Sequence, residues 1–155
     1  MAKKVTSQVQ FGIGQIDQLL ETYANLLEHT LESPPDLVEV TALGSVLHSF
    51  YNGLESIFLS IAKEVDARVP TGAHWHRDLL SQMAEPTHGR GPVLSPEMVS
   101  RLADYLGFRH FYRHSYSFCL EWDELAKLVM SLVDVWEQAR EELQVFLQGL
   151  SSDDI

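Results

Sequence analysis

The chain has 155 residues, with 22 Asp and Glu against 11 Lys and Arg, so its formal net charge is −11. A chain of this length buries about 70% of the surface that it exposes when unfolded, so we expect one hydrophobic core that needs no disulfide or metal. Its single cysteine, Cys119, cannot form an intrachain disulfide, which agrees with a reducing compartment. The acidity argues against nonspecific binding to nucleic acid, which depends on neutralising phosphates.

No run of 18 apolar residues occurs, and polar side chains follow residues 1–4. We therefore expect neither a membrane span nor a signal peptide, and a cytoplasmic protein. Residues 1–155 should form a single domain, with a frayed tail over 152–155.

Apolar residues at helical spacing predict the first two long helices. The first runs from about Ser7 to Leu31. The second runs from about Pro35 to Ala67, where Ser33 can cap it and Pro34 suits its first position. Its apolar residues alternate in steps of four and three, a pattern that is typical of a bundle seam.

Residues 69–94 contain three prolines and three glycines, which predict a long connection. A short amphipathic helix, Trp75 to Met83, should fold back from it onto the bundle. The third long helix opens at Ser95, which can cap it, with Pro96 at its first helical position, and it runs into residues 109–116. The fourth spans about Trp122 to Leu150. The predicted fold is all-α, an elongated four-helix bundle with an additional short helix in the connection between helices two and three.

The densest chemistry lies in residues 109–116, which read RHFYRHSY. Arg109 presents a permanently charged fork that suits phosphate oxygens, and His114 can give or take a proton near neutral pH. Together they suit cleavage of a phosphodiester without a metal, and this chemistry needs RNA because DNA lacks the attacking 2′-hydroxyl. His110 and Arg113 are candidates for supporting or RNA-contacting roles.

Helix geometry restricts how this motif can work. At about 100° per residue, His114 lies roughly 140° around an ideal helix from Arg109, whereas Tyr116 returns to within about 20° of Arg109. A straight helix therefore cannot aim Arg109 and His114 at one atom. Either the helix ends or distorts between Arg113 and Ser117, or two copies of the chain line a groove from two directions.

The pattern Arg109-x4-His114-x-Tyr116, with a polar residue directly after the arginine, resembles the HepT toxins of the HEPN superfamily. Residues 47–58 and 75–80 are also similar to that family, and the resemblance covers most of the chain. It implies the toxin of a type II toxin-antitoxin system, a metal-independent endoribonuclease that acts as a homodimer with Arg109 and His114 lining a cleft between subunits. It also implies an MntA-type nucleotidyltransferase antitoxin that silences the toxin by AMPylation of Tyr116. The added negative charge and bulk would compete with RNA beside Arg109.

Two other functions remain open on the sequence. The chain can be a non-catalytic HEPN protein that serves as nucleotide-binding or docking partner of a nucleotidyltransferase, or it can be a structural dimerising bundle. We favour the ribonuclease, because its motif positions are all present.

Histidines flank Trp75, but a third ligand is missing at a suitable spacing, so we expect no metal and no cofactor. Glu55 lies one position past the apolar seam of the second predicted helix. It is able to reach Arg109 in the fold, although we expect its carboxylate to be solvated. Phe111 and Tyr112 should pack, or in the alternative stack on bases.

Charge is distributed unevenly along the chain. Between Arg68 and His114 lie six arginines and four carboxylates, a local charge of +2, which leaves −13 for the rest. We expect the phosphate-facing surface in this segment. Within it, His88 and Arg90 of the long connection are candidates for a lid over RNA.

Overall fold

The structure is a computed structural model that describes residues 2–114 and 120–153. Every regular element in these two ranges is helical, which confirms the all-α prediction. The elements in chain order are α1 (Ala2–Thr22), α2 (Ala24–Glu32), α3 (Leu37–Ile61), the π-helical turn η1 (Ala62–Asp66), α4 (Trp75–Gln82), α5 (Pro96–Arg113) and α6 (Trp122–Asp153).

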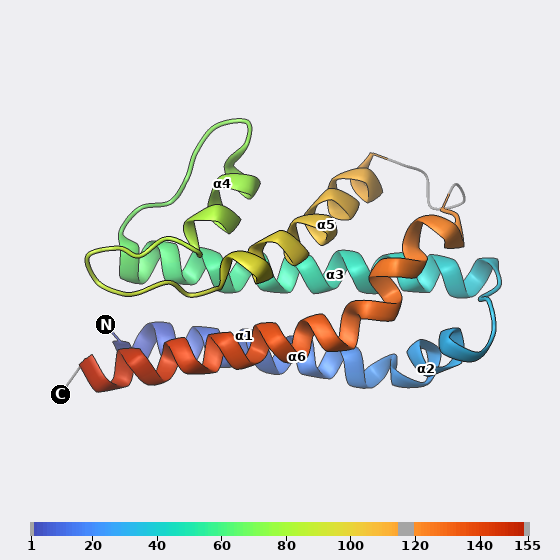
Figure 1. Ribbon diagram of the computed structural model, residues 1–155, viewed down its shortest axis with the longest axis horizontal. Helices are drawn as coiled ribbons and strands as arrows, with labels where there is room; N and C mark the ends of the chain where they lie inside the picture. The colour runs from blue at the N-terminus through green and yellow to red at the C-terminus, as the bar shows by residue number, and fades with distance from the viewer. Residues whose placement is uncertain (1, 115–119, 154–155) are drawn as a thin grey trace.

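Helix α3 is the centre of an elongated bundle. It contacts α1, α4, α5 and α6. Figure 1 shows it running along the molecule, with α1 and α2 below it in this view, α4 and α5 above it, and α6 crossing it from above on the right to below on the left. The predicted arrangement of four long helices and one short helix is therefore confirmed, with α4 as the short helix.

The first predicted helix is two helices. It begins at Ala2, before the expected Ser7, and it breaks at Tyr23 between α1 and α2. The Thr22 hydroxyl donates a hydrogen bond of 2.7 Å to the carbonyl of Gln18, a contact that bends helices. The Tyr23 amide donates to the Leu19 carbonyl at 3.2 Å, and the Tyr23 carbonyl accepts from the Leu27 amide at 3.0 Å, so α2 follows on from α1 as a bend.

The start of α3 also differs from the prediction. Asp36 caps the helix, in place of Ser33, and the first helical residue is Leu37. The Asp36 carboxylate accepts a hydrogen bond of 2.8 Å from the Glu39 amide, and the Glu39 carboxylate accepts one of 3.0 Å from the Asp36 amide. This reciprocal box stabilises the helix start by about 0.5–2 kcal/mol.

Helices α1 and α3 lie unusually close together. A methyl group on Gly12 would lie 2.5 Å from Cγ1 of Ile57, and one on Gly53 would lie 2.9 Å from Cγ1 of Ile16. Both distances are too short for real carbon contacts, so glycine is needed at these two crossings.

The core around α3 is aromatic at its middle. The Phe50 ring meets the rings of Tyr105 and Trp136 edge to face, at centroid distances of 5.4 and 6.1 Å. The Tyr105 hydroxyl donates to the carbonyl of Leu128 at 2.7 Å, so this buried phenol has its partner. These contacts join α3, α5 and α6 and fix the direction of α5.

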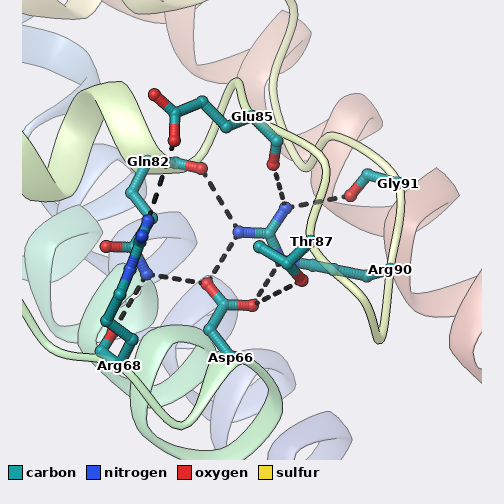
Figure 2. A network of polar contacts seen from close by, with 7 residues as sticks. All are labelled: Asp66, Arg68, Gln82, Glu85, Thr87, Arg90 and Gly91. Atoms are coloured by element: carbon teal, nitrogen blue, oxygen red, sulfur yellow. Dashed lines mark hydrogen bonds and ion pairs between the residues drawn. The ribbon is translucent and has the colours of Figure 1, made fainter.

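The end of α3 and the long connection are held by a buried ion pair. Arg90 and Asp66 each expose 1% of the side chain, and two nitrogens of Arg90 donate to the two oxygens of Asp66 at 2.8 and 2.7 Å. The remaining donors bond the carbonyls of Gln82, Glu85 and Gly91. Figure 2 shows this network closing around the guanidinium.

The Arg90 network corrects the lid hypothesis. The guanidinium has five N–H groups, and the five contacts use them all. Arg90 is therefore a structural anchor for the connection and cannot reach out to RNA. His88 is exposed beside it, on the short turn between Thr87 and Arg90.

The last helix, α6, extends to Asp153, three residues beyond the predicted end at Leu150. Of the tail that we expected to fray, residues 152–153 belong to this helix and 154–155 lie outside the described residues. Among the described helices, none combines the length and the hydropathy that a membrane span requires.

Candidate functional site

The motif lies on the last turns of α5. Ser95 caps this helix with a 3.1 Å hydrogen bond from the Met98 amide, and Pro96 occupies its first position, as predicted. The helix continues without distortion through Arg109 to Arg113, and His114 forms its C-cap. The helix therefore ends where we expected that it could, between Arg113 and Ser117. Tyr116 lies outside the described residues.

Arg109 points from α5 toward α3. Its Nε donates a hydrogen bond of 2.5 Å to Oδ1 of Asn52, and its Nη2 lies 3.6 Å from Oε1 of Glu55. The Arg109 side chain is only 12% exposed. Within the described residues its Nη1 has no hydrogen-bond partner, so the fork is held in place while donors remain for a ligand.

Glu55 connects this arginine to α4. Its side chain is 7% exposed, and its Oε2 accepts a 2.7 Å hydrogen bond from Nδ1 of His76. The expectation of a solvated carboxylate was wrong, because α4 folds back over α3 and covers Glu55. One carboxylate thus contacts both Arg109 and His76, and it offsets the cost of burying the guanidinium.

His48 continues the network on the other side of Asn52. The Asn52 oxygen accepts from Arg109, so its amide nitrogen donates to Nε2 of His48, at 3.0 Å. The His48 ring stacks on Tyr112, at a centroid distance of 4.8 Å. Burial, reinforced by the positive charges of Arg109 and Arg113, lowers the pKa of His48 below its usual 6.5.

Two buried polar atoms in this cluster lack partners among the described residues. They are Nδ1 of His48 and the hydroxyl of Tyr51. Burial raises the pKa of Tyr51, and the negative charge of Glu55 adds to that rise. The phenol is therefore neutral at ordinary pH.

These α3 residues were largely missed by sequence reasoning. His48, Asn52 and Glu55 are spaced by four and three residues, so they lie on one face of α3 and form a polar stripe beside the apolar seam. The spacing was readable in the sequence. Its importance depends on α5 bringing Arg109 against this face, a contact that the sequence raised for Glu55 alone and as the less favoured alternative.

Apart from Tyr112, the remaining described motif residues do not contact this network. His110, Arg113 and His114 are all exposed, and the rings of His110 and His114 lie 4.6 Å apart. Phe111 is exposed as well, whereas Tyr112 packs against the core. The structure brings Arg109 together with α3, and no contact joins it to His114 within the described part of the chain.

Several arginines between Arg68 and His114 already form ion pairs, so this basic segment has fewer side chains free to bind phosphate than its charge suggested. Arg90 is sealed with Asp66, and Arg101 pairs with Asp134 at 3.0 Å. Arg68 lies 3.7 Å from Glu85 at the surface. Among the described residues, the exposed arginines of this segment that form no ion pair are Arg77 on α4 and Arg113 on α5, so the phosphate-facing surface that we expected over the whole segment is reduced to these two places.

The described residues contain no group of three or more His, Cys, Asp or Glu side chains placed to hold a metal ion. The chemistry of the cluster is that of a fixed guanidinium, a buried carboxylate and several imidazoles. Such groups act on phosphates by charge stabilisation and proton transfer.

A family model described as HepT-like protein matches residues 42–150. The chain belongs to the HepT-like family. The match runs from α3 to α6 and includes each site residue named above. Comparison with curated proteins and with solved structures gave no significant match.

Family membership identifies the fold as a HEPN-type helical bundle and indicates the toxin side of a toxin-antitoxin system, with RNA as the general class of target. HepT-like proteins share the nuclease-type HEPN fold, which agrees with the placement of Arg109 in a polar cluster at the bundle surface.

Proposed function

We propose that this HepT-like protein is a metal-independent endoribonuclease, the toxin of a type II toxin-antitoxin system. The observation that carries the proposal is the state of Arg109. Its guanidinium is fixed by Asn52 and Glu55, and Arg113 and His114 are exposed on the same end of α5 without contacting it. A preorganised positive fork and an exposed proton-transfer group, once brought to one phosphate, are what phosphodiester cleavage requires.

In this mechanism Arg109 binds the scissile phosphate and stabilises the negative charge that builds up on it. The 2′-hydroxyl of the neighbouring ribose attacks the phosphorus, and the 5′-oxygen leaves. His114 transfers a proton at one of these two oxygens, and His110 and Arg113 contact the flanking phosphates. RNA is the substrate because the attacking hydroxyl belongs to ribose.

A homodimer supplies the geometry that one chain lacks. Arg109 faces α3 and His114 caps the far side of the same helix end, so one copy does not direct both at a single phosphate. A second copy that packs across the ends of the two α5 helices would bring His114 of one chain to Arg109 of the other. The exposed Phe111 ring lies on the same helix end and would be covered there.

We further propose an MntA-type nucleotidyltransferase antitoxin as partner, with Tyr116 as its target. Tyr116 follows the C-cap of α5 by two residues. AMPylation of its hydroxyl would add a negatively charged phosphodiester and an adenosine close to Arg113 and Arg109. Such a group would occupy the cationic surface and exclude RNA.

One observation favours a second function, a non-catalytic docking or nucleotide-binding partner of the nucleotidyltransferase. Arg109 is mostly buried and already paired with Glu55, so it has less to gain from a phosphate than a free arginine has. In that function the exposed end of α5 would be a docking surface and RNA would not be cut.

Unmodified protein incubated with RNA in EDTA separates the two functions. The ribonuclease predicts chain breaks by the wild type, with a loss of cleavage in Arg109→Ala and His114→Ala. Arg101→Ala is the matched control, since Arg101 lies two turns earlier on α5 and pairs at the surface with Asp134; it should cleave normally. Intact RNA with the unmodified wild type, or undiminished cleavage by His114→Ala, would contradict the proposal.

A further inference from the structure

We propose that His76 is a second proton-transfer residue of this site, the general base that Glu55 holds beside Arg109 within the same subunit. This inference rests on the proposed ribonuclease function. The sequence offered His76 only as half of a doubtful metal pair with His74, and the structure gives it another role.

The contacts of His76 define its chemistry. The Glu55 carboxylate can only accept, so Nδ1 of His76 donates the 2.7 Å hydrogen bond. In the neutral ring Nε2 is then the nitrogen with the free lone pair. The Trp75 ring covers one side of the imidazole, at a centroid distance of 3.7 Å, which restricts its rotation.

His76 also lies close to the phosphate-binding group. Glu55 contacts His76 through Oε2 and Arg109 through Oε1, so the imidazole and the guanidinium lie on either side of one carboxylate. The His76 side chain is 25% exposed, compared with 7% for Glu55. A phosphodiester held by Arg109 would meet the open edge of His76, while Glu55 stays covered beneath.

The reaction needs two proton-transfer groups, and the motif supplies one. As the bond from the 2′-oxygen to phosphorus forms, a base removes the proton of the 2′-hydroxyl. As the bond from phosphorus to the 5′-oxygen breaks, an acid gives that oxygen a proton, which leaves a 2′,3′-cyclic phosphate and a 5′-hydroxyl. With His76 as base and His114 of the second copy as acid, both transfers are accounted for.

Glu55 suits His76 for the role of base. When Nε2 takes up the proton, the ring becomes positive, and the buried carboxylate on Nδ1 stabilises that charge. The charged groups around the ring are Glu55 and, across it, Arg109, together with Arg77 and Asp78 on α4 itself. Glu55 is the one in direct contact with the ring.

Two substitutions separate proton transfer from a structural role. His76→Asn keeps an amide donor near the position of Nδ1, where it can still bond Glu55, but it cannot take up a proton. His76→Ala removes both properties. His74→Ala is the matched control, because His74 is exposed at the start of the same helix.

The measurement is the rate of RNA cleavage in EDTA across pH, with circular dichroism to check that each variant is folded. We expect both His76 variants to lose roughly 10²–10⁴-fold in rate and to lose the rise of activity with pH that a general base produces. His74→Ala should keep the wild-type rate and profile. Wild-type rate and pH profile in His76→Asn would overturn the role of His76 alone, whereas intact RNA with the wild type would overturn the proposed function as well.

Discussion

Two arginine-carboxylate pairs in this bundle are built from the same residue types and differ in what they leave available. Arg90 meets Asp66 with two short hydrogen bonds, and each side chain is 1% exposed. Arg109 has one hydrogen bond to Asn52 and a looser contact of 3.6 Å to Glu55, and solvent reaches it.

The difference shows how an arginine that can bind a ligand is distinguished from one that only stabilises the fold. A guanidinium whose donors all have protein partners holds the backbone and has nothing left for a ligand. A guanidinium that is oriented but incompletely bonded still has donors for an anion. We therefore expect substitution of Arg90 to reduce mainly the stability of the fold, and substitution of Arg109 to reduce mainly the activity.

The largest effect is expected at the structural pair. Arg90→Ala should lower the free energy of unfolding by about 3–5 kcal/mol, because it leaves Asp66 buried and unpaired. Denaturant unfolding measures this loss. The control is Arg101→Ala, which removes an exposed pair with Asp134 and should cost no more than about 1 kcal/mol. Equal losses in the two variants would show that the Arg90 network does not anchor the connection.

At the other pair the main effect should be on catalysis. Arg109→Lys keeps the charge but loses the planar fork, so RNA cleavage should fall by roughly 10²–10³-fold, as when one preorganised donor is removed. The unfolding free energy should change little compared with Arg90→Ala, because Arg109 is less completely bonded. If Arg109→Lys unfolded readily yet cleaved RNA at the normal rate, Arg109 would have a structural role and the proposed difference between the two arginines would be wrong.

The smallest effect concerns pH and His48. Because the folded chain lowers the pKa of His48 below 6.5, the unfolded chain binds its proton more readily. Stability should therefore fall as pH drops below 6.5 toward the lowered pKa, and it should be unaffected above 6.5. His48→Gln should make this fall shallower, as measured by unfolding at several pH values. His88→Gln, at an exposed position, is the control, and the same slope in both variants would exclude this role for His48.

The sequence predicted the helical parts of this molecule well, because apolar spacing and caps are local properties. Ser95 and Pro96 set the start of α5 as expected. The same reasoning missed the bend at Tyr23, which depends on a hydroxyl of Thr22 bonding back to the helix. It also chose Ser33 over Asp36 as the cap of α3, since the reciprocal contact with Glu39 was overlooked.

The site was predicted only in part, for a physical reason. Helix geometry predicted that Arg109 and His114 point in different directions, and in the structure Arg109 contacts α3 whereas His114 is exposed at the C-cap of α5. The partners of Arg109 come from α3, and the burial of Glu55 depends on α4 folding back. Contacts between residues far apart in the chain are set by packing, which single-helix patterns do not reveal.

The central claim is a composite site in which Arg109 of one copy works with His114 of another. Mixing the inactive variants Arg109→Ala and His114→Ala under conditions where subunits exchange tests it directly. Each mixed dimer would contain one site with both side chains intact, so cleavage should recover to roughly a quarter of the wild-type rate. Failure of the exchanged mixture to cleave RNA, when wild-type dimers treated in the same way remain active, would contradict the account.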